Sequence, residues 1–281
     1  KGNWYREMKE KKNQNRLGKG RTLILSIILV FGILAAIVFF LARSISTEMS
    51  ESAISNLSES LKLLKGTMEV ILKKEAEFQK LIAQELAVSE DPDLLIRSYS
   101  RNNTMVKLSL IHEGETVGIS NTGEEFTAEG LEFPDGKAVE DLPISKSYVN
   151  DMGTWAYTIK CPVTKDGKEA SVLYIEYIYD SFDEALPNRF YNSNATLYLM
   201  DGESQRFVLR PTGVGERTVG HMNLADFYRA NRILEEGIQE ELADSLKNGE
   251  NVMFYHDIQN KESLIYMWAV NGGSLYLIGY V

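Results

Sequence analysis

The sequence predicts an α+β protein in which one long helical region precedes two tandem modules, each built on an antiparallel sheet. Three observations lead to this class. The run Thr22–Ala42 is apolar and uncharged over 21 residues. From Ile45 to about Leu95 the only Gly and Pro residues are Gly66 and Pro92, and good helix formers dominate. After Pro92, short β-rich runs alternate with Gly-containing turns in two successive sets.

The apolar run at 22–42 has the length of a transmembrane helix, and a buried core helix is the weaker alternative. About 20 residues cross the roughly 30 Å hydrocarbon layer, and the run lacks the small-residue cleavage site of a signal peptide. Eight Lys and Arg precede it, whereas Arg43, Glu48 and Glu51 follow. Because basic flanks stay in the cytoplasm, we expect residues 1–21 to be a cytoplasmic tail and the bulk of the chain to be extracellular or periplasmic.

The chain beyond Arg43 is acidic. It holds 21 of the 30 Lys and Arg and 38 of the 40 Asp and Glu, which gives it a net charge of −17. A nucleic-acid partner is excluded, because it would need a basic surface. Cys161 is the only cysteine, so an intrachain disulfide cannot form. This composition is typical of an exported bacterial domain that relies on its hydrophobic core.

Residues 44–97 are predicted to form one long stalk or signalling helix. Its apolar residues recur at the alternating three and four spacing of a heptad seam. The seam comprises Ile54, Leu57, Leu61, Leu64, Met68, Ile71, Phe78 and Ile82. Two alternatives stay open for it. It pairs with a second copy of the chain and forms a homodimer, or it packs against the protein's own sheet as an amphipathic helix does.

The first module is expected at 98–185. Its expected strands are Met105–Ile111, Glu115–Ser120, Thr154–Cys161 and Glu169–Tyr179. The last two flank Asp166-Gly167, a pair that favours a tight two-residue hairpin turn. This hairpin is the clearest local signal in the chain.

The second module is expected at 190–281, after a short connecting helix at Ser181–Asn194. The expected elements are strands Ala195–Met200 and Gln205–Leu209, a helix at Leu224–Lys247, and strands Val252–Asp257, Ser263–Val270 and Ser274–Val281. Asn248-Gly249 is expected to end the helix and Asn271–Gly273 to form the last turn. The final strand runs to the last residue, so the chain reads as a piece of a longer protein.

This order of elements resembles the double Cache sensor domain of bacterial receptors, in which each module is a PAS-like sheet. The resemblance covers roughly 44–281. It rests on the architecture and on the stretches Ile144–Tyr148, Trp155–Val163, Asp166-Gly167 and Ser171–Asp180. In that family a small molecule usually binds the first, membrane-distal module, between the sheet and an overlying loop. The resemblance implies that Tyr148, Trp155 and Tyr157 line a pocket and that Glu176 lies where amine-binding relatives carry an acidic residue.

Glu176 also stands out by its surroundings. It shares a strand face with Tyr174 in an apolar and aromatic run, and burial of an unpaired carboxylate is costly. A bound cation or amine would compensate the charge. The alternatives are a solvent-facing position or a pair with Lys160 or Arg101. Relatives that bind amino acids carry an Arg just before the pocket Tyr, whereas this chain has the sequence Glu140–Ile144, which puts an amino-acid ligand in doubt.

No catalytic set and no metal site are predicted. His112, His221 and His256 are scattered without zinc-ligand spacing. The loop Gly213–Gly220 lacks the Lys-Ser/Thr of a phosphate-binding loop. We therefore expect this segment to be no enzyme and to bind no cofactor.

The predicted function is the small-molecule-sensing input region of a bacterial transmembrane receptor. A second membrane helix is expected after Val281, followed by an output module. A histidine kinase of a two-component system, simple or hybrid, is the first choice, and a diguanylate cyclase or a chemoreceptor is the alternative. A rival from another class is a membrane-anchored domain that binds a protein partner and senses nothing.

Overall fold

The computed structural model describes residues 2–102, 104–186, 195–209 and 222–281. The side chains are described from Phe31 onward, except those of residues 42, 45–47, 49, 50 and 180. The chain divides into two compact units, Lys1–Ser58 and Glu59–Val281. The described part of the first unit is helical, and the second unit contains every strand of the described chain.

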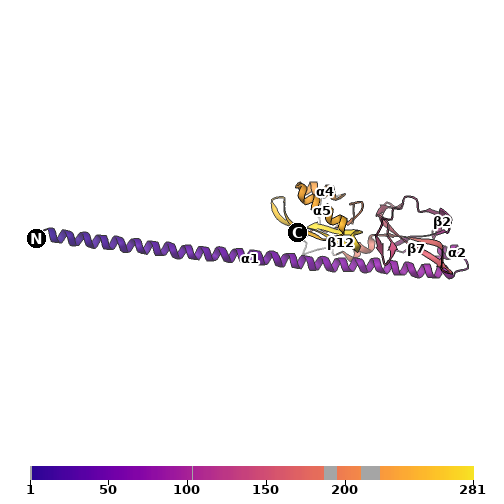
Figure 1. The fold of residues 1–281 in the computed structure, drawn as a ribbon, viewed down its shortest axis with the longest axis horizontal. Helices are drawn as coiled ribbons and strands as arrows, with labels where there is room; N and C mark the ends of the chain where they lie inside the picture. Colours follow the sequence, from indigo (N-terminus) through magenta and orange to yellow (C-terminus); the bar gives the residue numbers. More distant parts are fainter. Residues whose placement is uncertain (1, 103, 187–194, 210–221) are drawn as a thin grey trace. The chain divides into compact units, whose positions relative to one another are not determined.

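Helix α1 spans Gly2–Val88 (Figure 1). Its backbone is helical across 22–42, where the sequence predicts a membrane span. The side chains of residues 22–30 and 42 lie outside the described ones. Among the side chains that are described, no helix has both the length and the apolar character needed to cross a membrane. The span at 22–42 stays a prediction.

From Glu59 onward, α1 has one buried face and one exposed face. The buried residues of this part are Leu61, Met68, Leu72, Glu75, Ala76, Gln79, Ile82, Ala83 and Leu86. Three residues of the predicted seam, Leu61, Met68 and Ile82, are among them, so this part of the seam packs within the chain's own second unit. Phe78 of the seam is instead 41% exposed.

The end of α1 differs from the prediction of one helix over 44–97. α1 ends at Val88, and a separate helix α2 spans Pro92–Ser98. Asp91 caps α2, because its Oδ1 accepts a hydrogen bond of 3.0 Å from the backbone N–H of Leu94. Pro92 occupies the first turn, where no hydrogen-bonding N–H is needed. The two residues therefore start a new helix and do not continue the old one.

The first sheet has six antiparallel strands in the order β3-β2-β1-β8-β7-β6. Its strands are β1 Met105–His112, β2 Val117–Ser120, β3 Glu125–Thr127, β6 Tyr148–Val149, β7 Trp155–Lys165 and β8 Lys168–Ile178. A small ladder pairs β4 Ala138–Val139 with β5 Leu142–Pro143. Asp166 (φ 52°) and Gly167 (φ 76°) form the predicted β7–β8 hairpin turn, which is confirmed.

The second sheet has five antiparallel strands in the order β10-β9-β13-β12-β11. Its strands are β9 Tyr198–Asp201, β10 Phe207–Leu209, β11 Val252–Ile258, β12 Lys261–Val270 and β13 Leu275–Tyr280, and the 3₁₀ turn η2 spans Asn271–Gly273. Two helices, α4 Leu224–Ala230 and α5 Glu236–Asn248, replace the single predicted one (Figure 1). They close an aromatic core that includes Tyr198, Phe207, Phe227 and Tyr276.

Helix α3 spans Asp180–Ala185. It covers the start of the connecting helix predicted at Ser181–Asn194, and residues 187–194 lie outside the described residues. The predicted loop Gly213–Gly220, with His221, also lies outside them.

Candidate ligand-binding site

Strand β8 gives the first sheet two different faces. Leu173, Ile175 and Tyr177 are buried, and the Tyr177 hydroxyl donates a hydrogen bond of 3.2 Å to the backbone oxygen of Glu75 in α1. Tyr174 and Glu176 alternate with them and are only partly buried. Because successive strand residues point to opposite faces, these two lie on the face away from α1, which we call the outer face.

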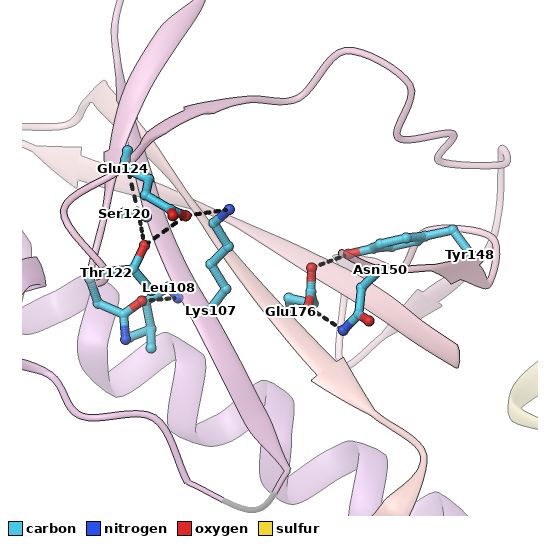
Figure 2. A network of polar contacts seen from close by, with 9 residues as sticks. Lys107, Leu108, Ser120, Thr122, Glu124, Tyr148, Asn150 and Glu176 are labelled. Atoms are coloured by element: carbon cyan, nitrogen blue, oxygen red, sulfur yellow. Dashed lines mark hydrogen bonds and ion pairs between the residues drawn. The ribbon is translucent and has the colours of Figure 1, made fainter. Parts of the chain in front are cut away.

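The Glu176 carboxylate accepts two hydrogen bonds on the outer face. The hydroxyl of Tyr148 donates to Oε2 and the side-chain amide of Asn150 donates to Oε1, each at 2.9 Å (Figure 2). The Tyr148 hydroxyl also lies 2.7 Å from Oγ1 of Thr158. The Asn150 amide is oriented by its own Oδ1, which accepts from the backbone N–H of Thr154 at 3.0 Å. Both donors are therefore held in place.

Both groups that hold the carboxylate are neutral. Burial first, and then the nearby charge of Glu176, raises the pKa of Tyr148 far above its ordinary value, so the hydroxyl stays protonated as a donor. In the described chain, the ion pairs include no basic partner for Glu176. The predicted alternative, a pair with Lys160 or Arg101, is not the arrangement found.

Two lysines on the outer face have other contacts. Lys107 is the cross-strand neighbour of Glu176, but its Nζ lies 3.7 Å from Oε2 of Glu124 (Figure 2). The Nζ of Lys160 lies 4.5 Å from the ring centre of Phe133, in a cation–π contact. The negative charge of Glu176 is thus solvated by hydrogen bonds but not neutralised by an ion pair.

Tyr174 lies in an aromatic cluster on the same face. Its ring centre is 5.3 Å from that of Phe126 in the edge strand β3 and 6.3 Å from that of Phe133 in the segment that follows β3. An open hollow of 710 Å³ borders this cluster and is lined by Tyr174, Val172, Ile111 and a rim that includes acidic residues. Glu176 does not line this hollow, so Tyr174 and Glu176 belong to different parts of the outer face.

The structure does not bring Tyr157 to the outer face. Tyr157 is 0% exposed and points toward α1, where its hydroxyl bonds Glu75. Trp155, two residues earlier in β7, follows the same alternation. Tyr157 therefore lies on the face of the sheet opposite to Glu176, and the assignment of Trp155 and Tyr157 to a ligand pocket stays a prediction.

A β-bulge explains why Tyr157 and Glu176 lie on opposite faces of the sheet. The turn pairs Lys165 with Lys168, and an undistorted ladder continued from there would pair Tyr157 with Glu176. The register shifts between Val163 and Thr164, so Thr158 pairs with Glu176 instead. A shift of one residue moves a side chain to the opposite face, which brings the Thr158 hydroxyl to the site.

Sequence reasoning missed two residues of the site, Asn150 and Thr158. The backbone N–H of Asn150 donates to the backbone oxygen of Thr154 at 3.0 Å. Gly153, with φ 75°, lies in the turn between them. An Asn followed by a Gly-containing turn was the available signal for Asn150. The segment Glu140–Ile144, where an Arg is absent, turns away from the site, because Glu140 lies 3.3 Å from Nζ of Lys73 in α1.

The described residues contain no group of three His, Cys, Asp or Glu placed to hold a metal ion. His112 instead forms a contact of 2.8 Å with Asp93 of α2.

Sequence comparison shows no known family that matches this chain. No curated protein matches it either. Comparison of folds does find matches. The ligand-binding domain of the Pseudomonas aeruginosa amino-acid chemoreceptor PctC, in complex with GABA, matches with a TM-score of 0.58 and 13% identity over 81% of this chain and 98% of that domain.

Two further solved domains match in the same way. The sensory domain of the Campylobacter jejuni chemoreceptor Tlp3, with isoleucine bound, has a TM-score of 0.53 and 15% identity over 84% of this chain and 94% of its own. The ligand-binding domain of the P. aeruginosa chemoreceptor PctB, in complex with L-Arg, has a TM-score of 0.52 and 13% identity over 81% of this chain and 94% of its own.

These likenesses establish the fold. The chain has the fold of these chemoreceptor ligand-binding domains, with a long helix and two antiparallel sheets in tandem. The resemblance drawn from the sequence is confirmed at this level.

Proposed function

We propose that this chain is the small-molecule-sensing input region of a bacterial transmembrane receptor, and that it is not itself an enzyme. The single observation that carries the proposal is the Glu176 carboxylate. It is half-buried on the outer face and is held by Tyr148 and Asn150, both neutral. A carboxylate fixed in this way without a countercharge suits a cationic group of a ligand.

The proposed ligand class is a primary amine. An ammonium group has three donors, which can use the remaining lone pairs of the Glu176 carboxylate. GABA, isoleucine and arginine, which the similar solved domains bind, each carry an ammonium group. In this chain the segment 140–144 holds no Arg for a ligand carboxylate, so we propose that the amine is required and a carboxylate is not.

Pairs of compounds that differ only in the amine test this proposal. The full chain, purified in detergent, is heated with γ-aminobutyrate against butyrate and with putrescine against 1,4-butanediol. A ligand at 100 times its dissociation constant stabilises the fold by about 2.7 kcal/mol. We expect a raised melting temperature with at least one amine and none with its partner. Equal shifts within each pair would exclude amine recognition.

The rival function, a membrane-anchored domain that binds a protein and senses nothing, makes the opposite prediction. It predicts no stabilisation by any member of a library of amines, amino acids, carboxylates, purines and sugars. The absence of stabilisation by every compound would remove the support that Glu176 gives to the sensing function.

The membrane anchor and the output module are proposed from the sequence. The apolar run at 22–42 and its basic flank support an N-terminal span with residues 1–21 in the cytoplasm. The sequence favours a histidine kinase as output, and the fold shared with chemoreceptor domains also suits a chemoreceptor, with a diguanylate cyclase third. The domain composition of the full-length protein distinguishes the three.

We also propose a homodimer through α1, by a different stripe from the predicted seam. Leu63, Val70, Leu81 and Val88 are each at least 50% exposed. They are separated by seven, eleven and seven residues, close to whole numbers of helical turns, so they lie along one line of α1, which Lys74 and Glu77 interrupt between Val70 and Leu81. A second copy of the same helix offers a line of matching length and chemistry.

A further inference from the structure

A buried hydrogen-bonded joint connects the two sheets of the second unit. Asp201, the last residue of β9, is 3% exposed, and Ser147, just before β6, is 8% exposed. Oδ2 of Asp201 accepts hydrogen bonds from the backbone N–H of Ser147 at 2.9 Å and from its hydroxyl at 2.7 Å. Oδ1 accepts from the backbone N–H of Ser204 at 2.7 Å. Oδ1 thus stabilises the turn that follows β9, and Oδ2 binds the residue that precedes β6 of the first sheet.

Tyr179 completes the joint. Its hydroxyl lies 2.6 Å from Oγ of Ser147. The single hydroxyl proton of Ser147 goes to the carboxylate, so Tyr179 must be the donor in this contact. Burial, and then the negative charge of Asp201, raises the pKa of Tyr179 well above its ordinary value, which keeps that proton in place. A buried carboxylate with all its donors fixed makes a rigid connection.

The joint is adjacent in the chain to the candidate site. Ser147 binds Asp201, and the next residue, Tyr148, binds Glu176. Successive side chains of an extended segment point to opposite sides, so one short piece of backbone holds both contacts. A ligand that competes for Glu176 and displaces Tyr148 therefore also moves Ser147, which donates to Asp201.

On its other side the joint leads into the second sheet. Asp201 pairs with Leu275 of β13, and the backbone N–H of Gly202 donates to the oxygen of Ser274 at 2.9 Å. The approach is close, because a Cβ placed on Gly202 would lie 2.2 Å from the backbone oxygen of Gly273. Such close packing leaves little room for Asp201 to move relative to β13.

We propose that Asp201 is a positioning residue that couples the Tyr148–Glu176 site on the first sheet to the second sheet through Ser147. The inference rests on the proposed function for the occupant of the site. The coupling itself is a property of the free protein, so it is tested without a ligand.

Hydrogen–deuterium exchange of the full chain, followed by mass spectrometry, tests the coupling. Tyr148→Phe removes the hydroxyl that binds Glu176. We expect about tenfold faster exchange at the amides of 145–150 and also at 201–206 of the second sheet, where Ser204 reports the carboxylate directly. In an Asp201→Asn background, Tyr148→Phe should add no further change at 201–206. Glu176→Gln, which alters the same hydrogen bond, serves as a second probe.

Tyr174→Phe is the matched control, because it makes the same change on the same face but in the Phe126–Phe133 cluster. It should leave exchange at 201–206 unchanged. If Asp201→Asn does not fold, Ser147→Ala takes its place in the background. A merely structural Asp201 would lower stability but leave the effects of the two substitutions additive.

Three outcomes overturn the proposal. The first is unchanged exchange at 201–206 in both Tyr148→Phe and Glu176→Gln. The second is an acceleration there that persists undiminished with Asp201→Asn. The third is an equal acceleration in Tyr174→Phe. Failure of every amine to bind would refute the proposed ligand while leaving these exchange results to decide the coupling.

Discussion

The hydroxyl of Tyr157 in β7 donates a hydrogen bond to the carboxylate of Glu75 in α1, in the interior of the second unit. Glu75 is 9% exposed, and its Oε1 has no hydrogen-bond partner within the described residues. Burial, opposed by the Tyr157 hydrogen bond, raises the pKa of Glu75 from 4.5 to about 7. The helix is thus held to the sheet by a carboxyl group that favours its protonated form.

Glu75 should make the stability of the protein depend on pH. Because its folded-state pKa is above the unfolded value, its contribution is complete below about pH 4.5 and is lost as pH rises through about 7. The loss amounts to about 3 kcal/mol above that range. Glu75→Gln should therefore be more stable than the wild type at pH 8 by up to this amount and similar to it at pH 4.5, as measured by urea denaturation.

Glu77→Gln is the control for this pH dependence, since Glu77 is exposed on the same helix beside Lys73. It should keep the decline in stability between pH 4.5 and 8. An unaltered decline in Glu75→Gln would show that another group causes it.

Gln79 should stabilise the packing of α1 against the first sheet. Its Nε2 donates to the backbone oxygens of Ile159 at 2.8 Å and Leu173 at 3.0 Å, and the residue is 0% exposed. Gln79→Met keeps the side chain's length but removes both bonds, so we expect a loss of about 2 kcal/mol in the free energy of unfolding. Gln84→Met, at an exposed position of α1, should change it by less than about 0.5 kcal/mol. Equal effects of the two substitutions would refute this role.

Two glycines should respond to alanine in opposite directions. A Cβ on Gly279 of β13 would lie 1.9 Å from the backbone oxygen of Thr196, whereas a Cβ on Gly66 of α1 would meet no atom within 4 Å. Gly279→Ala should destabilise the fold by about 2 kcal/mol, because backbone must move. Gly66→Ala should stabilise it by about 0.5–1 kcal/mol, because Gly is a poor helix former. Thermal unfolding of both variants measures the difference, and a stabilising Gly279→Ala would contradict the packing described.

The proposed α1 dimer predicts a change of mass with little change of fold. Leu63→Glu with Leu81→Glu puts charges on the exposed apolar line, where neither side chain contributes to the core. Light scattering of the full chain in detergent should show twice the chain mass for the wild type and the single mass for the variant. Lys62→Glu, at an exposed position about a quarter turn away from the line, is the control for added negative charge. A monomeric wild type would rule out this interface.

The fold could be predicted from the sequence where local chemistry determines it. Asp166 and Gly167 take the positive φ angles of a tight turn, so the β7–β8 hairpin follows from two residues. The break after Val88 differs from the prediction of one helix over 44–97, because Asp91 and Pro92 start a new helix there.

The site was less predictable because it depends on register and on distant contacts. Because of the bulge at Val163–Thr164, Thr158 and not Tyr157 lies opposite Glu176. No residue type in the sequence indicates that shift in register. Asn150 and Glu176 are 26 residues apart, and Ser147 and Asp201 are 54 apart, so only the folded chain brings each pair together.

Binding of an amine at Glu176 is the central claim, and titration calorimetry of the full chain tests it most directly. The amine that gives the largest thermal shift is titrated into wild type, Glu176→Gln and Glu169→Gln, a control at an exposed carboxylate of the same strand. Loss of a charge-assisted contact costs about 1.5–3 kcal/mol, so Glu176→Gln should weaken binding at least tenfold and Glu169→Gln should not change it. Equal affinity of wild type and Glu176→Gln would contradict the claim.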